Sequence, residues 1–185
     1  MAGSLIKIDE FTVSSPIASV ILGGGSSGSS GLNASIDSTY DVYMVKINNM
    51  IPSTDYLLGA FRFTESGTPN TTSNYDRAAK FLRADTTFGN ISGTNEAQGY
   101  ITDDRNGTAG NESTQLIMYI FNANNSGEYT FCTIESSARD ASGNLNGRQG
   151  GNTFTSNSSV DGVQFYYISG NIDTGSKFTL YGLKK

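Results

Sequence analysis

The sequence contains no histidine and no tryptophan, and it has a single cysteine. Without histidine the chain lacks the usual general base near neutral pH and the commonest transition-metal ligand. Ser-His-Asp triads, Cys-His triads and histidine-based zinc sites are therefore excluded. A glycosidase would need two facing carboxylates, and no local motif pairs any two of the acidic residues. We therefore expect no catalytic residue, no cofactor and no metal site, and we expect that the protein is not an enzyme.

The single cysteine cannot form an internal disulfide. Cys132 lies between Phe131 and Thr133 in a strand-like run, which predicts a buried, inert thiol. Small secreted scaffolds that lack a sufficient core usually carry several disulfides. A chain without them must be held together by packing, within the domain or between subunits.

The chain also lacks an excess of basic residues. It has 12 Lys and Arg against 17 Asp and Glu, for a net charge of −5. A nucleic-acid-binding protein is expected to carry a basic stripe, so we expect no nucleic-acid partner. No apolar run approaches the roughly 20 residues of a transmembrane helix, and the N-terminus lacks the pattern of a secretory signal. We expect no membrane partner and synthesis in a cytoplasm.

Ser, Thr, Asn and Gly are abundant, and they separate short runs of apolar or alternating residues. This pattern is typical of β-strands. The run 115–122 contains residues 116–121, the most continuously apolar segment of the sequence, which predicts a strand covered on both faces. The turn residues at 123–127 predict a hairpin that joins 115–122 to 128–135. The predicted strands are residues 5–13, 40–47, 56–64, 115–122, 128–135, 163–169 and 177–183.

The last two predicted strands, 163–169 and 177–183, are separated by a turn-rich segment and predict a second hairpin. Residues 75–83 lack a period of two and form the one plausible helix, with a broken strand as the alternative. The Gly- and Ser-rich segment 23–31 predicts a long loop, or else a hinge that releases residues 1–13 as an N-terminal arm. Together these features predict an all-β fold, a single antiparallel, jelly-roll-like β-sandwich over residues 1–185.

Two polar segments are candidate sites. Residues 103–107, with Glu112 nearby, carry oxygen ligands that suit calcium. They lack EF-hand spacing and include Arg105, so an exposed polar turn is favoured. The glycine-rich segment 143–151 lacks the Gly-Lys-Ser/Thr ending of a phosphate-binding loop. It predicts a mobile connection whose central residues, Arg148 and Gln149, are candidates for contact with a partner.

The C-terminal region carries a family resemblance. Residues 162–168 form an aromatic run, followed by Ser169-Gly170-Asn171-Ile172 and then by Phe178-Thr179-Leu180-Tyr181-Gly182. This ending resembles that of small virion structural proteins of tailed bacteriophages, marine ones especially. The resemblance extends more weakly to residues 36–43 and 119–122. It implies no catalytic residues.

The resemblance implies a protein of the assembled virion, made in the host cytoplasm. Because the compact size does not suit a fibre, we expect a homotrimeric capsid decoration (cement) protein that binds across major capsid subunits and stabilises the head. The alternative is a tail-tip or receptor-binding module that recognises host surface glycans. With the loop 23–31, the candidate partner contacts are Met1, Ala2, Gly3, Ser4, Leu5, Arg148 and Gln149.

Overall fold

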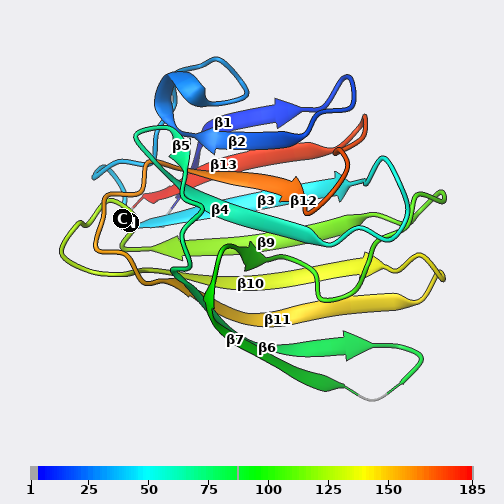
Figure 1. Cartoon of the computed structure of the whole chain (residues 1–185). Coiled ribbons are helices and arrows are strands. Elements are labelled where there is room, and N and C mark those ends of the chain that lie inside the picture. Colours follow the sequence, from blue (N-terminus) through cyan, green and yellow to red (C-terminus); the bar gives the residue numbers. More distant parts are fainter. Residues whose placement is uncertain (1–3, 87, 185) are drawn as a thin grey trace.

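The computed structural model describes residues 4–86 and 88–184. They form thirteen β-strands and one short 3-10 turn (Figure 1). The elements are β1 (Ser4–Thr12), β2 (Ser19–Gly23), η1 (Gly25–Ser27), β3 (Val42–Met50), β4 (Gly59–Glu65), β5 (Thr68–Pro69), β6 (Tyr75–Arg83), β7 (Gly89–Glu96), β8 (Gly99–Tyr100), β9 (Thr114–Phe121), β10 (Thr130–Arg139), β11 (Leu145–Phe154), β12 (Gly162–Tyr167) and β13 (Lys177–Lys184).

Two antiparallel sheets pack face to face, which confirms the predicted β-sandwich. The larger sheet has eight strands in the order β1-β13-β3-β9-β10-β11-β6-β7, and the smaller has five strands, β2-β12-β4-β5 with β8 paired to β4. The first four strands and the last two alternate between the sheets, so that β13 lies between β1 and β3 while β12 lies between β2 and β4. This winding is the jelly-roll feature of the fold.

The predicted hairpin of residues 163–169 and 177–183 is wrong, because β12 and β13 lie in different sheets. Both segments alternate apolar and polar residues. This pattern is the same for strands paired in one sheet and for strands that face each other across a core, and β12 and β13 face each other across the core. The rings of Phe165 and Phe178 meet between the sheets, with centroids 5.8 Å apart.

The predicted helix at 75–83 is also wrong, since these residues form β6, paired with β11 and β7. The inner face of β6 carries Tyr75 and then Arg77, Ala79, Phe81 and Arg83. Two arginines interrupt the apolar half of the alternation, so the period of two was hidden. The alternative prediction of a strand is the correct one.

Apolar side chains of both sheets fill the space between them. Aromatic rings form the centre of this core, with Phe61 at a centroid distance of 5.4 Å from Phe63 and 6.2 Å from Tyr75. Cys132 is 2% exposed, which confirms its predicted burial. The core depends on packing, as expected for a chain without a disulfide.

The hairpin of β9 and β10 is confirmed, with Phe121 opposite Phe131. The prediction that its first strand is covered on both faces is wrong. Burial alternates along β9: Leu116 and Met118 are buried, whereas Ile117 is 41% exposed and Tyr119 39% exposed. One face of this strand therefore points away from the core.

The Gly- and Ser-rich segment 23–31 connects β2 to β3 as a loop, as predicted. Gly24 and Gly25 have φ angles of 72° and 59°, in the left-handed region that glycine adopts most readily. The loop is fastened to its surroundings by backbone bonds, including Gly25 N to Ala34 O at 2.8 Å. The N-terminal residues from Ser4 onward are paired with β13 as β1.

Candidate binding surface

The sequence-predicted contacts are dispersed. Met1, Ala2 and Gly3 lie outside the described residues. Ser4 and Leu5 begin β1, and Leu5 is 47% exposed beside Leu183 of β13. Gln149 is exposed on β11, in the same sheet as Leu5 but with four strands between them. The structure therefore does not bring these residues together into one site.

Arg148 does not have the exposure that a partner contact requires. Most of the segment 143–151 is not a mobile connection but part of β11, with β10 on one side and β6 on the other. The Arg148 side chain is 0% exposed, and its Nη1 donates to Asp103 Oδ1 at 2.8 Å. Arg148 is therefore withdrawn from the candidate contacts, and the physical reason is that its charge neutralises a buried carboxylate.

Asp103 is the centre of a buried ion network beside the aromatic core. Its side chain is 0% exposed, and Arg77 Nη1 is the second donor at 3.2 Å. The Arg77 guanidinium lies 4.0 Å from the centre of the Tyr100 ring, a cation–π contact. Burial raises the pKa of Asp103 and lowers the pKa of Arg148. The network fixes the segment after β8 against the inner face of β6 and β11.

The expected exposed turn at 103–107 is thus largely buried, and Asp103 Oδ1 accepts hydrogen bonds from both Arg77 and Arg148. Asp104 pairs with Arg83, which also contacts Asp140. Among the described residues, no group of three or more His, Cys, Asp or Glu side chains has the arrangement to hold a metal ion.

The surface that stands out is the outer face of the eight-stranded sheet, the face directed away from the five-stranded sheet. No element of the described chain covers it (Figure 1). Large apolar side chains are exposed along it, which is unusual for a solvated sheet. These side chains are Leu5, Leu183, Ile117, Tyr119, Phe131 and Leu145.

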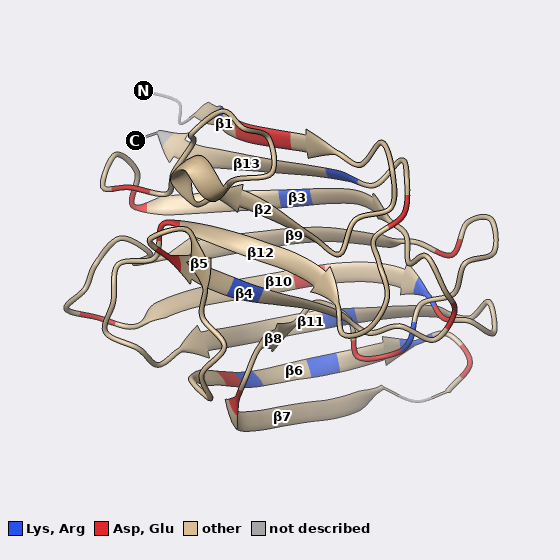
Figure 2. Ribbon diagram, turned by 45° about the horizontal axis from the view of Figure 1, so that its top comes forward, with Lys and Arg blue, Asp and Glu red and all other residues tan. Residues whose placement is uncertain are grey.

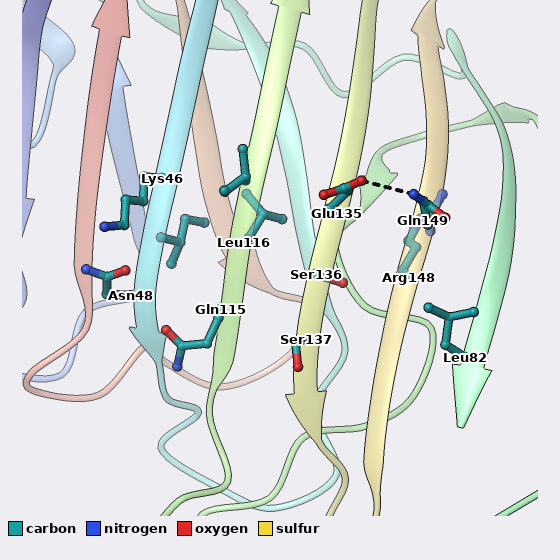
Figure 3. A pocket seen from close by; sticks show the side chains of 12 residues that line it. Lys46, Asn48, Leu82, Gln115, Leu116, Glu135, Ser136, Ser137, Arg148 and Gln149 are labelled. Carbon is teal, nitrogen blue, oxygen red and sulfur yellow. Dashed lines mark hydrogen bonds between the residues drawn. The ribbon is translucent and has the colours of Figure 1, made fainter. Parts of the chain in front are cut away.

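The centre of this outer face is hollowed. The central hollow has a volume of ≈ 490 Å³ and is bordered by Lys46 and Gln115 on one side and by Leu82 on the other (Figure 3). Glu135 and Gln149 lie between them, and Gln149 Nε2 donates to Glu135 Oε1 at 2.9 Å. The hollow thus offers amide and charged groups next to exposed apolar side chains.

A second hollow of ≈ 480 Å³ lies beside it over β10, β11 and β6. Small residues form its floor, among them Ala78, Thr133 and Gly151. A Cβ added at Gly151 would have Cys132 O as its nearest neighbour, at 3.4 Å. The outer face is therefore open above Gly151. We call this depression the Gly151 hollow.

Charged residues of both signs are interspersed over the molecule (Figure 2). On the outer face, Lys46 of β3 and Glu135 of β10 flank Ile117 in register. Among the described residues Lys46 makes no ion pair. The face therefore presents a mixed pattern and not a field of one sign.

Cys132 provides a test of the core that supports this face. Burial raises the pKa of its thiol to about 12, so the reactive thiolate is nearly absent at neutral and mildly alkaline pH. We expect the native protein to react negligibly with a thiol reagent under those conditions, and to react fully after unfolding in guanidinium chloride. Absorbance from Ellman's reagent measures both rates. A native rate close to the unfolded one would contradict the burial of this thiol.

Comparison of the chain with protein-family models, with curated proteins and with solved structures found no significant match. The described residues contain no helix that is long and apolar enough to cross a membrane. The family resemblance of the C-terminal sequence therefore stays a prediction.

Proposed function

We propose that the protein is a non-enzymatic structural protein of a tailed-phage virion, of the capsid decoration kind, which assembles with virion proteins through the outer face of its eight-stranded sheet. The observation that carries the proposal is the exposure of Ile117, Tyr119 and Phe131 on an uncovered sheet face. Contiguous exposed apolar residues with polar surroundings are typical of protein interaction sites. The C-terminal resemblance supports the assignment to a virion.

A decoration protein needs a rigid body and a surface, and no reactive group. The sandwich supplies the first through its aromatic core and the buried pair of Asp103 and Arg148. A ligand that binds only the assembled shell stabilises that shell by mass action. The expected effect is a head that resists heat or osmotic shock better with the protein than without it.

We expect purified protein to bind capsids that lack it. Cryo-electron microscopy of the mixture should show ordered density on the local symmetry axes of the shell. Ile117→Asp, which places a charge on the outer face, should abolish this density, because a carboxylate would be desolvated in the contact. The matched control is Leu32→Asp, a change at a residue that is 67% exposed in the loop between β2 and β3. Bare capsids with the unmodified protein would contradict the decoration role.

A second candidate is the recognition of host glycans, and a third hollow on the outer face, over β9, β10 and β11, favours it. Tyr119 offers an aromatic surface near the amide of Gln149 and the carboxylate of Glu135, in the hollow next to the central one. Such groups suit the faces and hydroxyl groups of sugars. Binding of the protein to host cells, together with bare capsids in the experiment above, would favour this function over decoration.

A further inference from the structure

Acidic and basic residues of the outer face follow a regular order across the strands, which the strand register defines. One row of laterally paired residues crosses the sheet at right angles to the strands. Beginning at β1 it carries an acidic residue, then a basic one on β3, Ile117 on β9, an acidic residue on β10 and a basic one on β6. The row is Glu10, Thr179, Lys46, Ile117, Glu135, Gln149, Lys80 and Asn90.

This order is complementary to itself about β9. Lys46 lies one strand from β9 on one side, and Glu135 lies one strand from it on the other. Glu10 and Lys80 each lie three strands from β9, again on opposite sides. A second copy turned by a two-fold axis along β9 would therefore place every acidic residue of this row opposite a basic one.

The neighbouring row is complementary in size. It runs through Tyr181, Met44, Tyr119, Thr133 and Gly151 in register. The same two-fold axis places Tyr181 of one copy over the Gly151 hollow of the other, while Tyr119 meets its own equivalent. The large side chain of Tyr181 thus faces Gly151, which has no side chain.

Other arrangements of a second copy fit less well. A two-fold axis at right angles to the strands would place Lys46 opposite Lys46 and Glu135 opposite Glu135, and like charges that face each other in an interface are costly. A trimer, which the family resemblance led us to expect, requires a contact between two different patches. The pattern on this face is instead complementary to itself.

We propose that the outer face of the eight-stranded sheet is the interface of a symmetric dimer, with β9 of each copy along the two-fold axis. This inference rests on the proposed function and narrows it: the virion protein that contacts the outer face is a second copy of the chain, and the dimer then meets the capsid through another of its surfaces. Strand spacing and rise give the face an area of roughly 900 Å², which is comparable with the ~800 Å² that each partner buries in a standard interface.

The charge pair nearest the axis, Lys46 and Glu135, allows a sharp test. Glu10 is already paired with Lys177 within its own chain, whereas Lys46 forms no ion pair with any residue that the structure describes. Lys46→Glu and Glu135→Lys each place like charges opposite each other twice in the dimer. We expect either single variant to weaken dimerisation by about tenfold or more. The double variant Lys46→Glu/Glu135→Lys restores opposite charges and should return the dissociation constant to near that of the unmodified protein.

Sedimentation equilibrium of the full chain measures these constants, and thermal melting checks that each variant is folded. Arg105→Glu, a charge reversal at an exposed loop residue off the outer face, is the matched control and should leave dimerisation unchanged. Gly151→Trp provides an independent variant, because its side chain fills the hollow that receives Tyr181. We expect this variant to remain folded and to be monomeric.

A monomeric or trimeric unmodified protein would overturn the proposed dimer, and so would a double variant that is no more dimeric than the single ones. The capsid experiment separates this failure from that of the proposed function. Protein that is monomeric in solution but decorates capsids would retain the function and lose the dimer. A dimer that responds to the charge reversals, but leaves capsids bare, would retain the dimer and lose the decoration role.

Discussion

Replacement of Arg148 by methionine is expected to lower the free energy of unfolding by about 3–5 kcal/mol. This is the usual cost of removing one charge of a buried ion pair while the other charge stays buried. Arg148 and Asp103 are both 0% exposed in their side chains. Methionine is close in length but offers no donor, so the Asp103 carboxylate would retain only Arg77 as a cationic partner. Chemical unfolding followed by circular dichroism measures the change, and this loss would be a large part of the stability of a typical domain.

Gln149→Met is the matched control, because Gln149 is the next residue of the same strand and is exposed. Its effect should stay within about 0.5 kcal/mol. The double variant Arg148→Met/Asp103→Asn should be more stable than Arg148→Met alone, since it leaves no buried carboxylate without its partner. Equal destabilisation by Arg148→Met and Gln149→Met would show that the ion pair does not contribute.

The destabilisation should also depend on pH. Burial already raises the pKa of Asp103 above its ordinary value of 3.8, and the loss of a guanidinium raises it further. A carboxyl group whose folded-state pKa is raised contributes least to stability when it is ionised. The cost of Arg148→Met should therefore be full at neutral pH and should shrink as the pH falls toward 3.8. A cost that grows on acidification would contradict this assignment.

The sequence predicted the fold where apolar residues alternate with polar ones between turn residues. The β9–β10 hairpin was found because the pairing is local and the segment 123–127 is rich in residues that turn the chain. The same logic failed for β12 and β13. An alternating run records which side of a strand is buried, and this is identical for Phe165 and Phe178 whether they lie in one sheet or face each other across two.

The inner face of β6 and β11 escaped prediction because it is polar. Arg77 and Arg148 occupy positions where the core pattern calls for apolar residues, and their carboxylate partner, Asp103, lies on a segment remote in sequence. Nothing local shows that an aspartate at 103 neutralises an arginine at 148. The glycines around Arg148 suggested a loop. Gly150 instead allows close contact between strands, since a Cβ there would overlap Ala78 O of β6.

The outer face was only partly accessible to sequence reasoning. The run 116–121 was recognised as unusually apolar, but its outward residues were assigned to a covered strand. In the structure Ile117 and Tyr119 are exposed, and the apolar character of that side is the feature that marks the candidate surface. The order of charges across the sheet could not be predicted, because the row combines residues from eight strands whose register is set by long-range pairing.

Phe61→Ala is expected to lower the free energy of unfolding by about 3–5 kcal/mol, the range measured for loss of a buried phenylalanine side chain. Phe61 is 0% exposed, and its ring contacts Phe63 of the same strand, Tyr75 of the larger sheet and Phe165 of β12. Its removal opens a cavity between the two sheets. The control is Phe88→Ala, the same change at a side chain that is 68% exposed, with an expected effect within about 0.5 kcal/mol.

A second substitution distinguishes the loss of this packing from a general weakening of the fold. A Cβ added at Gly99 would lie within van der Waals overlap of the Phe61 ring, so Gly99→Ala alone should destabilise by about 1–3 kcal/mol through overpacking. In the Phe61→Ala background the ring is gone, and the added methyl group enters space that the ring has left. The double variant should therefore lose less unfolding free energy than the sum of the two single losses. Strict additivity of the two changes in the free energy of unfolding would mean that Gly99 of β8 and Phe61 of β4, which lie opposite each other in one sheet, do not interact.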